Sequence, residues 1–388
     1  MKKHPEIIGV LFFEMQCKEV IKYIEGWAPK GIAWENDNVG LQIGNPESKI
    51  KNIMLSLELT DKVIEQAIEK KCNLIITHHP IFYRPLKKLN FSTDNISKQI
   101  DKIIKRNINL YSAHTNLDFT KDGVSFQLAK RIQLNNIKFL KNLSENQVKL
   151  AVFVPISNLG KVAEAIHNAG GGIIGEYSHC SFRTEGTGTF RGSDQAKPAF
   201  GNAGELETVK EIKLEILIDE WRLNTVINAM NLAHPYEEVA YDIITLKNEN
   251  VNYGMGAVGE LQKSLTESEF LELIATKLKA DNLRYTPGKK SKIKTVAVCG
   301  GACIELLEYA IEKNVDAFIT ADLKYHNFQD AEGKLFVIDA GHYETEIPVL
   351  DEIQRRLKRF LRVRHQTKVF KFRGSTNPII FYNKLGAN

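Results

Sequence analysis

Histidine and carboxylate side chains follow three short apolar segments of this 388-residue chain, at the points where the segments end. Each segment reads as a buried strand. Open α/β sheets place their ligands beyond the carboxyl ends of the strands, so side chains at three such ends could converge on one site. The residues concerned are His78 and His79, His114 and Asp118, and His342 and Glu346.

These six side chains could bind metal ions. Imidazoles and carboxylates without cysteine favour zinc, iron, manganese, nickel or cobalt over a thiolate site. Six candidate ligands exceed what one tetrahedral ion takes, which predicts two ions roughly 3.5–4 Å apart with a carboxylate or water between them. His114 could instead orient a ligand or fix a turn, and Glu346 could stabilise a helix N-terminus.

The segments that carry these residues predict two similar α/β lobes. Residues 53–80 read as strand, helix, strand and a polar patch, which is the β-α-β unit of a parallel sheet. Residues 295–326 repeat this order and end in a patch that includes His326. The helix after His342 is expected to begin near Thr345, because Pro348 is tolerated only in a first turn.

Residues 147–248 follow a different pattern. Their predicted order of β-α-β-β-α-β, interrupted by a Gly-, Ser- and Thr-rich stretch at 175–204, is the split unit of a ferredoxin-like domain. The flanks, 142–147 and 248–253, read as linkers. We therefore expect an α/β fold of two similar lobes, residues 1–146 and 249–388, that form a discontinuous core around an inserted ferredoxin-like α+β domain.

The composition is that of a globular protein, with 43% hydrophobic and 26% charged residues. Its longest apolar runs fall well short of a membrane span. Five scattered cysteines, an odd number, suit a reducing compartment and predict a cytoplasmic location. Cys299 and Cys303 lack a second Cys/His pair at zinc-finger spacing, and we expect them to be small core residues.

Five motifs, taken together, resemble the Nif-three-like family, whose bacterial members are often labelled GTP cyclohydrolase type two homologues. The motifs span nearly the whole chain and are residues 37–41 (DNVGL), 77–80 (THHP), 114–118 (HTNLD), 324–326 (KYH) and 341–346 (GHYETE). Residues 186–191 (GTGTFR) and 234–241 (HPYEEVAY) look like motifs of the domain that is inserted in the longer family members.

The resemblance implies a dinuclear metal centre in a cleft between the two lobes, and homohexamers built as trimers of dimers. By that likeness the metal ligands would be His78, His79, Asp118, His342 and Glu346. His114 and His326 match family positions near the metals. Glu58 stands where we would expect an aspartate, which argues against a direct role for that strand end.

These residues favour a metal-dependent hydrolase. Two ions would activate a water for attack on a carbonyl, ring carbon or phosphorus centre of a small molecule, such as a nucleotide or cyclic amide. His114 or His326 would be the catalytic acid or base, because histidine exchanges protons near neutral pH. No Walker-type phosphate loop is present to support nucleotide binding.

Two other classes of function stay open. One is a non-catalytic metal-binding oligomeric assembly, which would saturate its ions with protein ligands. The other is a nucleic-acid- or partner-binding protein, because residues 355–373 contain many basic residues and no acidic one. We favour a solvated helix face and an edge strand for this basic segment, so nucleic acid is the less favoured partner.

Overall fold

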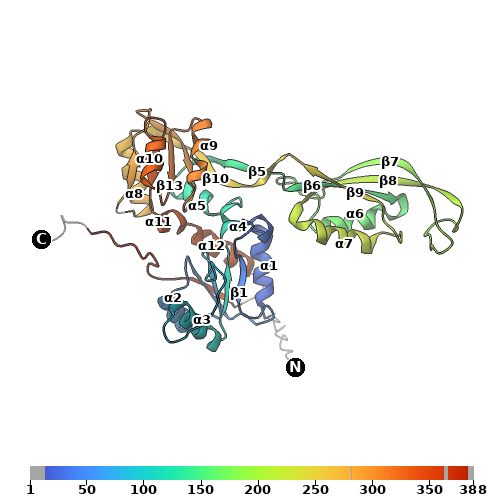
Figure 1. Ribbon diagram of the computed structural model, residues 1–388, viewed down its shortest axis with the longest axis horizontal. Coiled ribbons are helices and arrows are strands. Elements are labelled where there is room, and N and C mark those ends of the chain that lie inside the picture. Colours follow the sequence, from blue (N-terminus) through green and yellow to red (C-terminus); the bar gives the residue numbers. More distant parts are fainter. Residues whose placement is uncertain (1–13, 281, 362–365, 383–388) are drawn as a thin grey trace, which may run out of the picture. The chain divides into compact units, whose positions relative to one another are not determined.

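The structure is a computed structural model that describes residues 14–280, 282–361 and 366–382. The chain forms two compact units. The first combines Met1–Lys141 with Met255–Asn388, and the second consists of Asn142–Gly254. Figure 1 labels many of the helices and strands of both units.

One sheet of the first unit has the strand order β1-β4-β3-β2-β15. β2, β3, β4 and β15 are parallel, and β1 is antiparallel to β4. Ser56 pairs with Thr77 and Thr77 with Ser112, so the central strands end at one edge of the sheet. The strands are Gly40–Ile43 (β1), Asn52–Ser56 (β2), Leu74–Thr77 (β3), Asn109–Ser112 (β4) and Lys368–Lys371 (β15).

Helices cover both faces of this sheet. Ile53 and Leu55 of β2 pack toward α1 and α12, whereas Met54 packs toward α2 and α3, because successive strand residues point to opposite faces. The Thr60 side chain accepts a hydrogen bond from the Val63 N–H and so caps α2. The helices are Cys17–Trp27 (α1), Asp61–Glu69 (α2), Asn95–Lys105 (α3) and Val349–Leu361 (α12).

The second sheet of this unit has the order β11-β14-β13-β12-β10-β5. β12, β13 and β14 are parallel, while β10 and β11 pair antiparallel with β12 and β14. The first sheet thus contains four adjacent parallel strands and the second sheet three. The strands are Asn135–Ser144 (β5), Glu249–Leu265 (β10), Arg284–Thr286 (β11), Ile293–Val298 (β12), Ala317–Thr320 (β13) and Phe336–Asp339 (β14).

The helices of the second sheet also lie on both faces. Phe336 packs with α8 and α5, and Phe318 packs with α9 and α10. Two short helices, α4 and α11, follow β4 and β14 directly and carry candidate ligands. These helices are Thr115–Asp118 (α4), Val124–Arg131 (α5), Glu267–Leu278 (α8), Leu307–Glu312 (α9), Tyr325–Ala331 (α10) and His342–Glu346 (α11).

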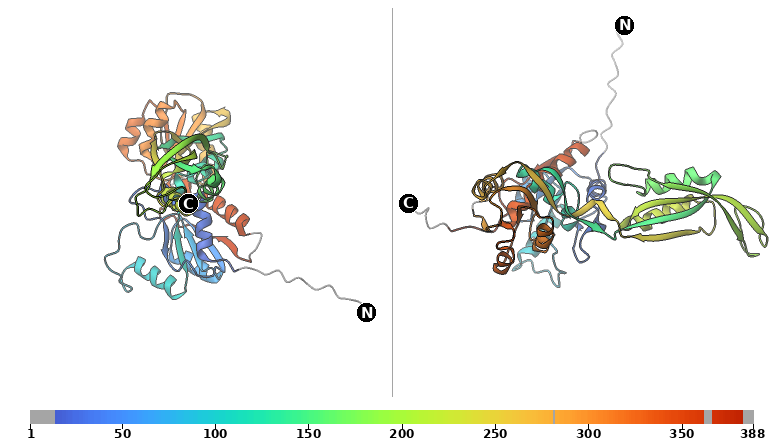
Figure 2. Two further views of the ribbon diagram at one scale, coloured as in Figure 1. Left: turned by 90° about the vertical axis from the view of Figure 1, so that its right-hand side faces the viewer. Right: turned by 90° about the horizontal axis from the view of Figure 1, so that it is seen from above.

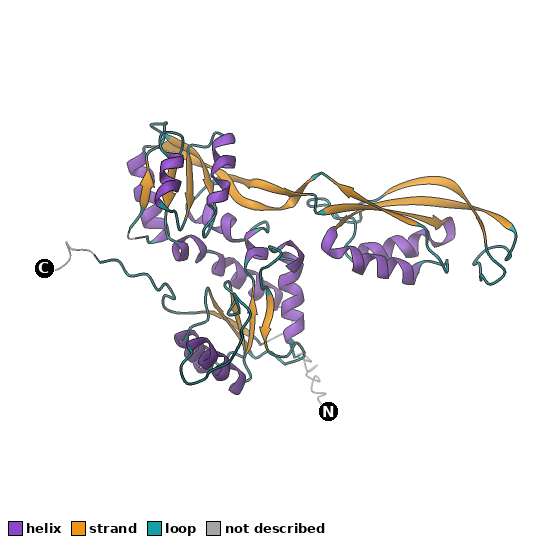
Figure 3. Cartoon of the chain, viewed as in Figure 1, coloured by secondary structure: helices purple, strands orange, loops and turns teal. Residues whose placement is uncertain are grey.

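The second unit holds one antiparallel sheet of order β7-β8-β6-β9. β7 and β8 run side by side over ten residue pairs, Phe182 to Arg191 against Glu215 to Leu206 (Figure 2). α6 and α7 pack on one face only (Figure 3). The elements are Gln147–Pro155 (β6), Leu159–Asn168 (α6), Phe182–Arg191 (β7), Leu206–Asp219 (β8), Leu223–Ala233 (α7) and Tyr241–Leu246 (β9).

Several segments differ from the sequence-based expectation. The flanks read as linkers belong largely to strands, since β5 reaches Ser144 and β10 begins at Glu249. β7 occupies part of the Gly- and Thr-rich stretch. α11 begins at His342 rather than near Thr345, and Pro348 instead separates α11 from α12.

Cys299 is buried as predicted, but it is joined to Cys303 in a disulfide. The turn at Gly300 and Gly301 brings the two residues to a Cα–Cα distance of 6.0 Å. Gly301 has a φ of +72°, which L side chains rarely adopt. Both cysteines belong to one hydrophobic core, with Cys303 partly buried against it, and the disulfide between them is the feature that the sequence analysis did not predict.

The basic segment lies on α12 and the edge strand β15. Arg355 and Arg356 both pair with Glu352, and Lys371 pairs with Asp351, so the first unit's own carboxylates meet part of this charge. Arg362 and Arg364 lie outside the described residues. Among the described residues, no helix has the length and apolar character that crossing a membrane requires.

Candidate metal centre

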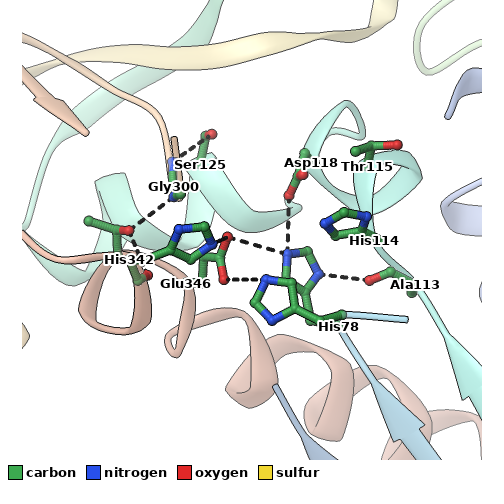
Figure 4. Close-up of polar contacts among 12 residues, drawn as sticks. His78, Ala113, His114, Thr115, Asp118, Ser125, Gly300, His342 and Glu346 are labelled. Atoms are coloured by element: carbon green, nitrogen blue, oxygen red, sulfur yellow. Dashed lines mark hydrogen bonds and ion pairs between the residues drawn. The ribbon is translucent and has the colours of Figure 1, made fainter. Parts of the chain in front are cut away.

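The ends of β3, β4 and β14 bring their histidines and carboxylates together (Figure 4). The Nε2 atom of His78 lies 3.6 Å from Asp118 Oδ1 and 3.6 Å from Glu346 Oε1. Glu346 Oε1 lies 2.9 Å from His342 Nε2, and Glu346 Oε2 lies 3.1 Å from His79 Nε2. Glu346 is therefore the central carboxylate of the cluster.

Local chain geometry fixes these positions. The backbone N–H groups of His78 and His79 both donate to the Leu57 carbonyl, which turns the chain at the end of β3. α11 is about one turn long, so His342 and Glu346 lie four residues apart on one side of it. Gly341 precedes this helix with a φ of +87°, where a Cβ would also meet Glu344.

Each imidazole of the cluster bonds an acceptor through its Nδ1 atom. His78 Nδ1 lies 2.7 Å from the Ala113 carbonyl, and His79 Nδ1 lies 3.1 Å from Glu58. His114 and His342 use the carboxylates of Asp37 (2.8 Å) and Asp322 (2.6 Å) in the same way. Because these acceptors carry no proton to give, we assign the ring proton to Nδ1, which leaves the Nε2 lone pair of a neutral ring for a metal ion.

Two polar atoms of the cluster, His78 Nε2 and Asp118 Oδ1, are buried without a hydrogen-bond partner in the described part of the chain. Unpaired buried polar atoms are costly, and a bound cation would satisfy both at once. The atoms that could bind one ion form two groups that share His79. The groups are His78, His79 and His114, and His79, His342 and Glu346.

Electrostatics favour a positive charge at this point. Burial raises the pKa of Glu346, but the charge and hydrogen bonds of His78, His342 and His79 outweigh it and bring that pKa well below its usual range. Burial and the nearby Glu346 carboxylate raise the pKa of Asp118 well above its usual range. Two buried carboxylates therefore compete for positive neighbours, which is the arrangement that a metal ion stabilises.

The pKa values of two histidines beside Glu346 are raised, whereas that of Glu346 is lowered. Burial lowers the pKa of His79, but hydrogen bonds to Glu346 and Glu58 raise it to about 10. His342 follows the same pattern through Glu346 and Asp322, and its pKa rises to about 9. Without metal these two imidazoles hold protons that a metal ion would have to displace.

The cluster opens into a cavity of about 340 Å³. Aromatic side chains of Trp34, Tyr83 and Phe119 form part of its wall, and the turn that carries Gly301 forms another part. A Cβ at Gly301 would lie 2.5 Å from Glu346 Oε1, so the backbone approaches the cluster as closely as only glycine permits. A small molecule can therefore reach the candidate ligands.

The structure brings together six of the seven predicted site residues. His326 is the exception: it lies exposed on α10, its Nδ1 bonds Gln329 at 2.9 Å, and it does not line the cavity. Glu58, which we expected to have no direct role, bonds His79 and Thr376.

Sequence reasoning missed the partners of the imidazoles. Asp37 stands in the DNVGL motif and also accepts hydrogen bonds from the Thr115 N–H and hydroxyl. Burial raises the pKa of Asp37, yet the hydrogen bonds from His114 and Thr115 lower it to about 2. Asp322 follows β13 as the other site residues follow their strands, and this position is the signal that could have identified it.

A family model described as Duf34/NIF3 (NGG1p interacting factor 3) matches residues 15–378. The chain belongs to this family. The family resemblance noted in the sequence is thus confirmed. The mixed α/β architecture also matches that of a solved NIF3 structure: the Bacillus cereus protein related to NIF3 has 35% sequence identity and a TM-score of 0.82, with 95% of this chain and 100% of that chain covered.

Other relatives agree over similar lengths. A Bacillus subtilis protein named "GTP cyclohydrolase 1 type 2 homolog" is 39% identical over 368 residues, which are 94% of this chain and 98% of that protein. Staphylococcus aureus protein SA1388 has a TM-score of 0.76 at 28% identity and covers 95% of this chain and 99% of its own. The likeness therefore includes both compact units.

Proposed function

We propose that the chain is a hydrolase that uses two divalent transition-metal ions in the cavity of the first unit. The observation that carries the proposal is the presence of two buried, unpartnered ligand atoms, His78 Nε2 and Asp118 Oδ1, beside a cavity that a small molecule can enter. A purely structural ion would not need this access.

The ligands of the proposal are His78, His79, Asp118, His342 and Glu346. The two oxygens of Glu346 face different imidazoles, as a carboxylate between two ions would. Five ligands are more than one tetrahedral ion takes, which supports two ions rather than one. Nitrogen and oxygen donors without thiolate suit Zn, Fe, Mn, Co or Ni.

When bound, such ions supply Lewis acidity that activates a water and polarises the bond to be cleaved. His114 lines the same cavity, and Asp37 holds its Nδ1 atom, so the ring is fixed with Nε2 toward the reacting groups. In this position His114 can take a proton from the attacking water and return it to the leaving group. His326 has no part in the proposal.

The aromatic wall of the cavity suits a planar substrate. Trp34 and Phe119 contact one another edge to face at 5.6 Å, and each offers a ring for stacking. The names of the relatives support a nucleotide or a cyclic amide as the substrate class.

We further propose that the second unit is an inserted ferredoxin-like domain. Its β6-α6-β7-β8-α7-β9 order, with both helices on one face of an antiparallel sheet, supports this assignment. A cytoplasmic homohexamer, built as a trimer of dimers, remains part of the proposal through the family resemblance.

The test is a turnover assay with protein loaded in turn with Mn, Zn, Fe and Co, against nucleotides, phosphodiesters and cyclic amides. We expect hydrolysis of at least one substrate, and its loss in Asp118→Asn together with loss of bound metal. Glu305→Gln, an exposed carboxylate in the same cavity wall, should keep its metal. If no substrate turns over and all metal positions are saturated by protein ligands, the chain is a metal-binding assembly instead.

A further inference from the structure

A second cavity, of about 700 Å³, lies entirely within the second unit. It is on the side of the sheet that α6 and α7 leave uncovered. Leu214 and Ile216 of β8 belong to the helix-facing core, so the alternating residues Glu211 and Lys213 point to the other face, where they line the cavity.

One buried carboxylate reaches this cavity. Glu211 is 8% exposed, and its Oε1 accepts a hydrogen bond of 2.6 Å from the Tyr236 hydroxyl. The hydrogen bonds of the described residues include none to its other oxygen, Oε2. Glu211 therefore keeps one acceptor for a ligand.

Position 188, next to Glu211 Oε2, has room only for glycine. A Cβ placed on Gly188 would lie 2.1 Å from Glu211 Oε2, which is closer than real contacts allow. A Cβ on Gly186, two residues earlier on the same strand, would meet nothing within 4 Å. In the GTGTFR motif, Gly188 therefore leaves room for the Glu211 carboxylate, and Gly186 leaves room for a ligand.

Aromatic rings pack around Tyr236, whose hydroxyl binds this carboxylate. Tyr236 makes edge contacts with Phe190 at 6.0 Å and with Phe200 at 6.1 Å. His234 supports Tyr236: its Nδ1 accepts from the Tyr236 N–H at 3.2 Å, and its Nε2 lies 3.1 Å from the Phe153 carbonyl. The HPYEE motif thus holds the Tyr236 ring and hydroxyl in place.

The charge of the lining disfavours an anion. Four carboxylates, Glu185, Glu211, Glu237 and Glu238, face two cations, Arg191 and Lys213. Lys213 also lies 3.7 Å from Glu215, which reduces its availability. A buried carboxylate among aromatic rings is the environment that an ammonium group with an apolar body prefers.

We infer that this cavity binds a small organic amine, whose ammonium group donates to Glu211 Oε2 and whose apolar body lies against Phe190, Tyr236 and Phe153. This site is independent of the metal centre and of the proposed hydrolysis. The second unit would thus recognise a small cationic ligand.

The test uses the full-length, metal-free protein and three probes of one shape: phenethylamine, 2-phenylethanol and phenylacetate. Saturation-transfer NMR and calorimetry should show binding of the amine, binding of the alcohol about tenfold weaker, and no binding of the acid. Glu211→Gln should weaken amine binding by about tenfold or more. Glu164→Gln, a surface carboxylate on α6, should leave it unchanged.

A second variant keeps the proposal testable if Glu211→Gln does not fold. Gly186→Phe would fill the open space in the cavity and should abolish amine binding. The proposal is overturned if none of the probes binds, if phenylacetate binds as well as the amine, or if amine binding survives in both Glu211→Gln and Gly186→Phe.

Discussion

The two cavities of the chain differ in how far the protein satisfies its own polar groups. In the first unit, His78 Nε2 and Asp118 Oδ1 are buried without hydrogen-bond partners among the described residues. In the second unit, Tyr236 donates to Glu211, and both ring nitrogens of His234 have partners. An unsatisfied buried set is costly until a cation completes it, whereas a largely satisfied set is stable without a ligand.

This contrast predicts that metal affinity in the first cavity falls sharply when a single ligand is changed. Glu346→Gln should weaken metal binding by more than about 100-fold, because the amide removes the charge that faces three imidazoles. Competition with a chromophoric chelator measures the change. The matched control is Glu344→Gln on the same helix, whose carboxylate accepts from Asn377. Equal affinity in both variants would remove Glu346 from the site.

Metal binding to the first cavity should release protons. The pKa values of His79 and His342 are about 10 and about 9 without metal, so both rings are protonated at neutral pH. Raised pKa values mean that protons oppose metal binding below those values. Affinity should therefore rise with pH by up to about 100-fold per unit until about pH 9.

Calorimetry in buffers of different ionisation enthalpy would measure this release, which we expect to be about two protons per chain at pH 7. Glu58→Gln should reduce it, because Glu58 helps to raise the pKa of His79. Metal binding without proton release would mean that these histidines are not ligands.

The sequence was most informative about the first cavity. The apolar run before His78, His79 and Pro80 identifies a buried strand, and the two histidines identify candidate ligands at its end. The ends of neighbouring parallel strands lie at one edge of a sheet, so such residues are expected to lie close together. It was less informative about partners such as Asp322 and Glu58, since an acidic residue after a strand has many roles.

The second cavity could not be predicted in the same way. β7 carries Thr184, Gly186 and Gly188 where a strand usually shows alternating apolar residues, because one of its faces lines a cavity instead of a core. The segments next to the second unit misled for a related reason. In these segments β5 and β10 hold polar residues that resemble a linker, and the sequence does not show that the two strands pair with one another.

The hydrogen-bond partners of the imidazoles should have intermediate effects. Asp322→Asn should weaken metal binding by about 10–100-fold, because Asp322 fixes the orientation and tautomer of His342. Asp330→Asn, an exposed carboxylate on α10, is the control and should change nothing. An unchanged affinity in Asp322→Asn would show that α11 alone positions His342.

Two glycines of β7 offer a smaller, matched comparison. Gly188→Ala should lower the free energy of unfolding by about 1 kcal/mol or more, because its Cβ displaces Glu211 from the Tyr236 hydroxyl. Gly186→Ala should be tolerated, since its Cβ enters open space. Thermal unfolding of both variants measures the difference, and equal melting temperatures would mean that Glu211 adapts without cost.

Removing the whole second unit should have the smallest effect on metal binding. All candidate ligands lie in the first unit, and β5 and β10 are hydrogen-bonded neighbours in one of its sheets, so a short Gly/Ser linker between Lys141 and Met255 can replace Asn142–Gly254. Elemental analysis should find the same metal content in this shortened chain as in the full one.

The second cavity is removed with the second unit. Because the two cavities share no lining residue, phenethylamine binding should vanish in the shortened chain while metal binding persists. If the shortened chain folds but loses its metal, the first cavity is not complete without the second unit, and the two sites are coupled rather than separate.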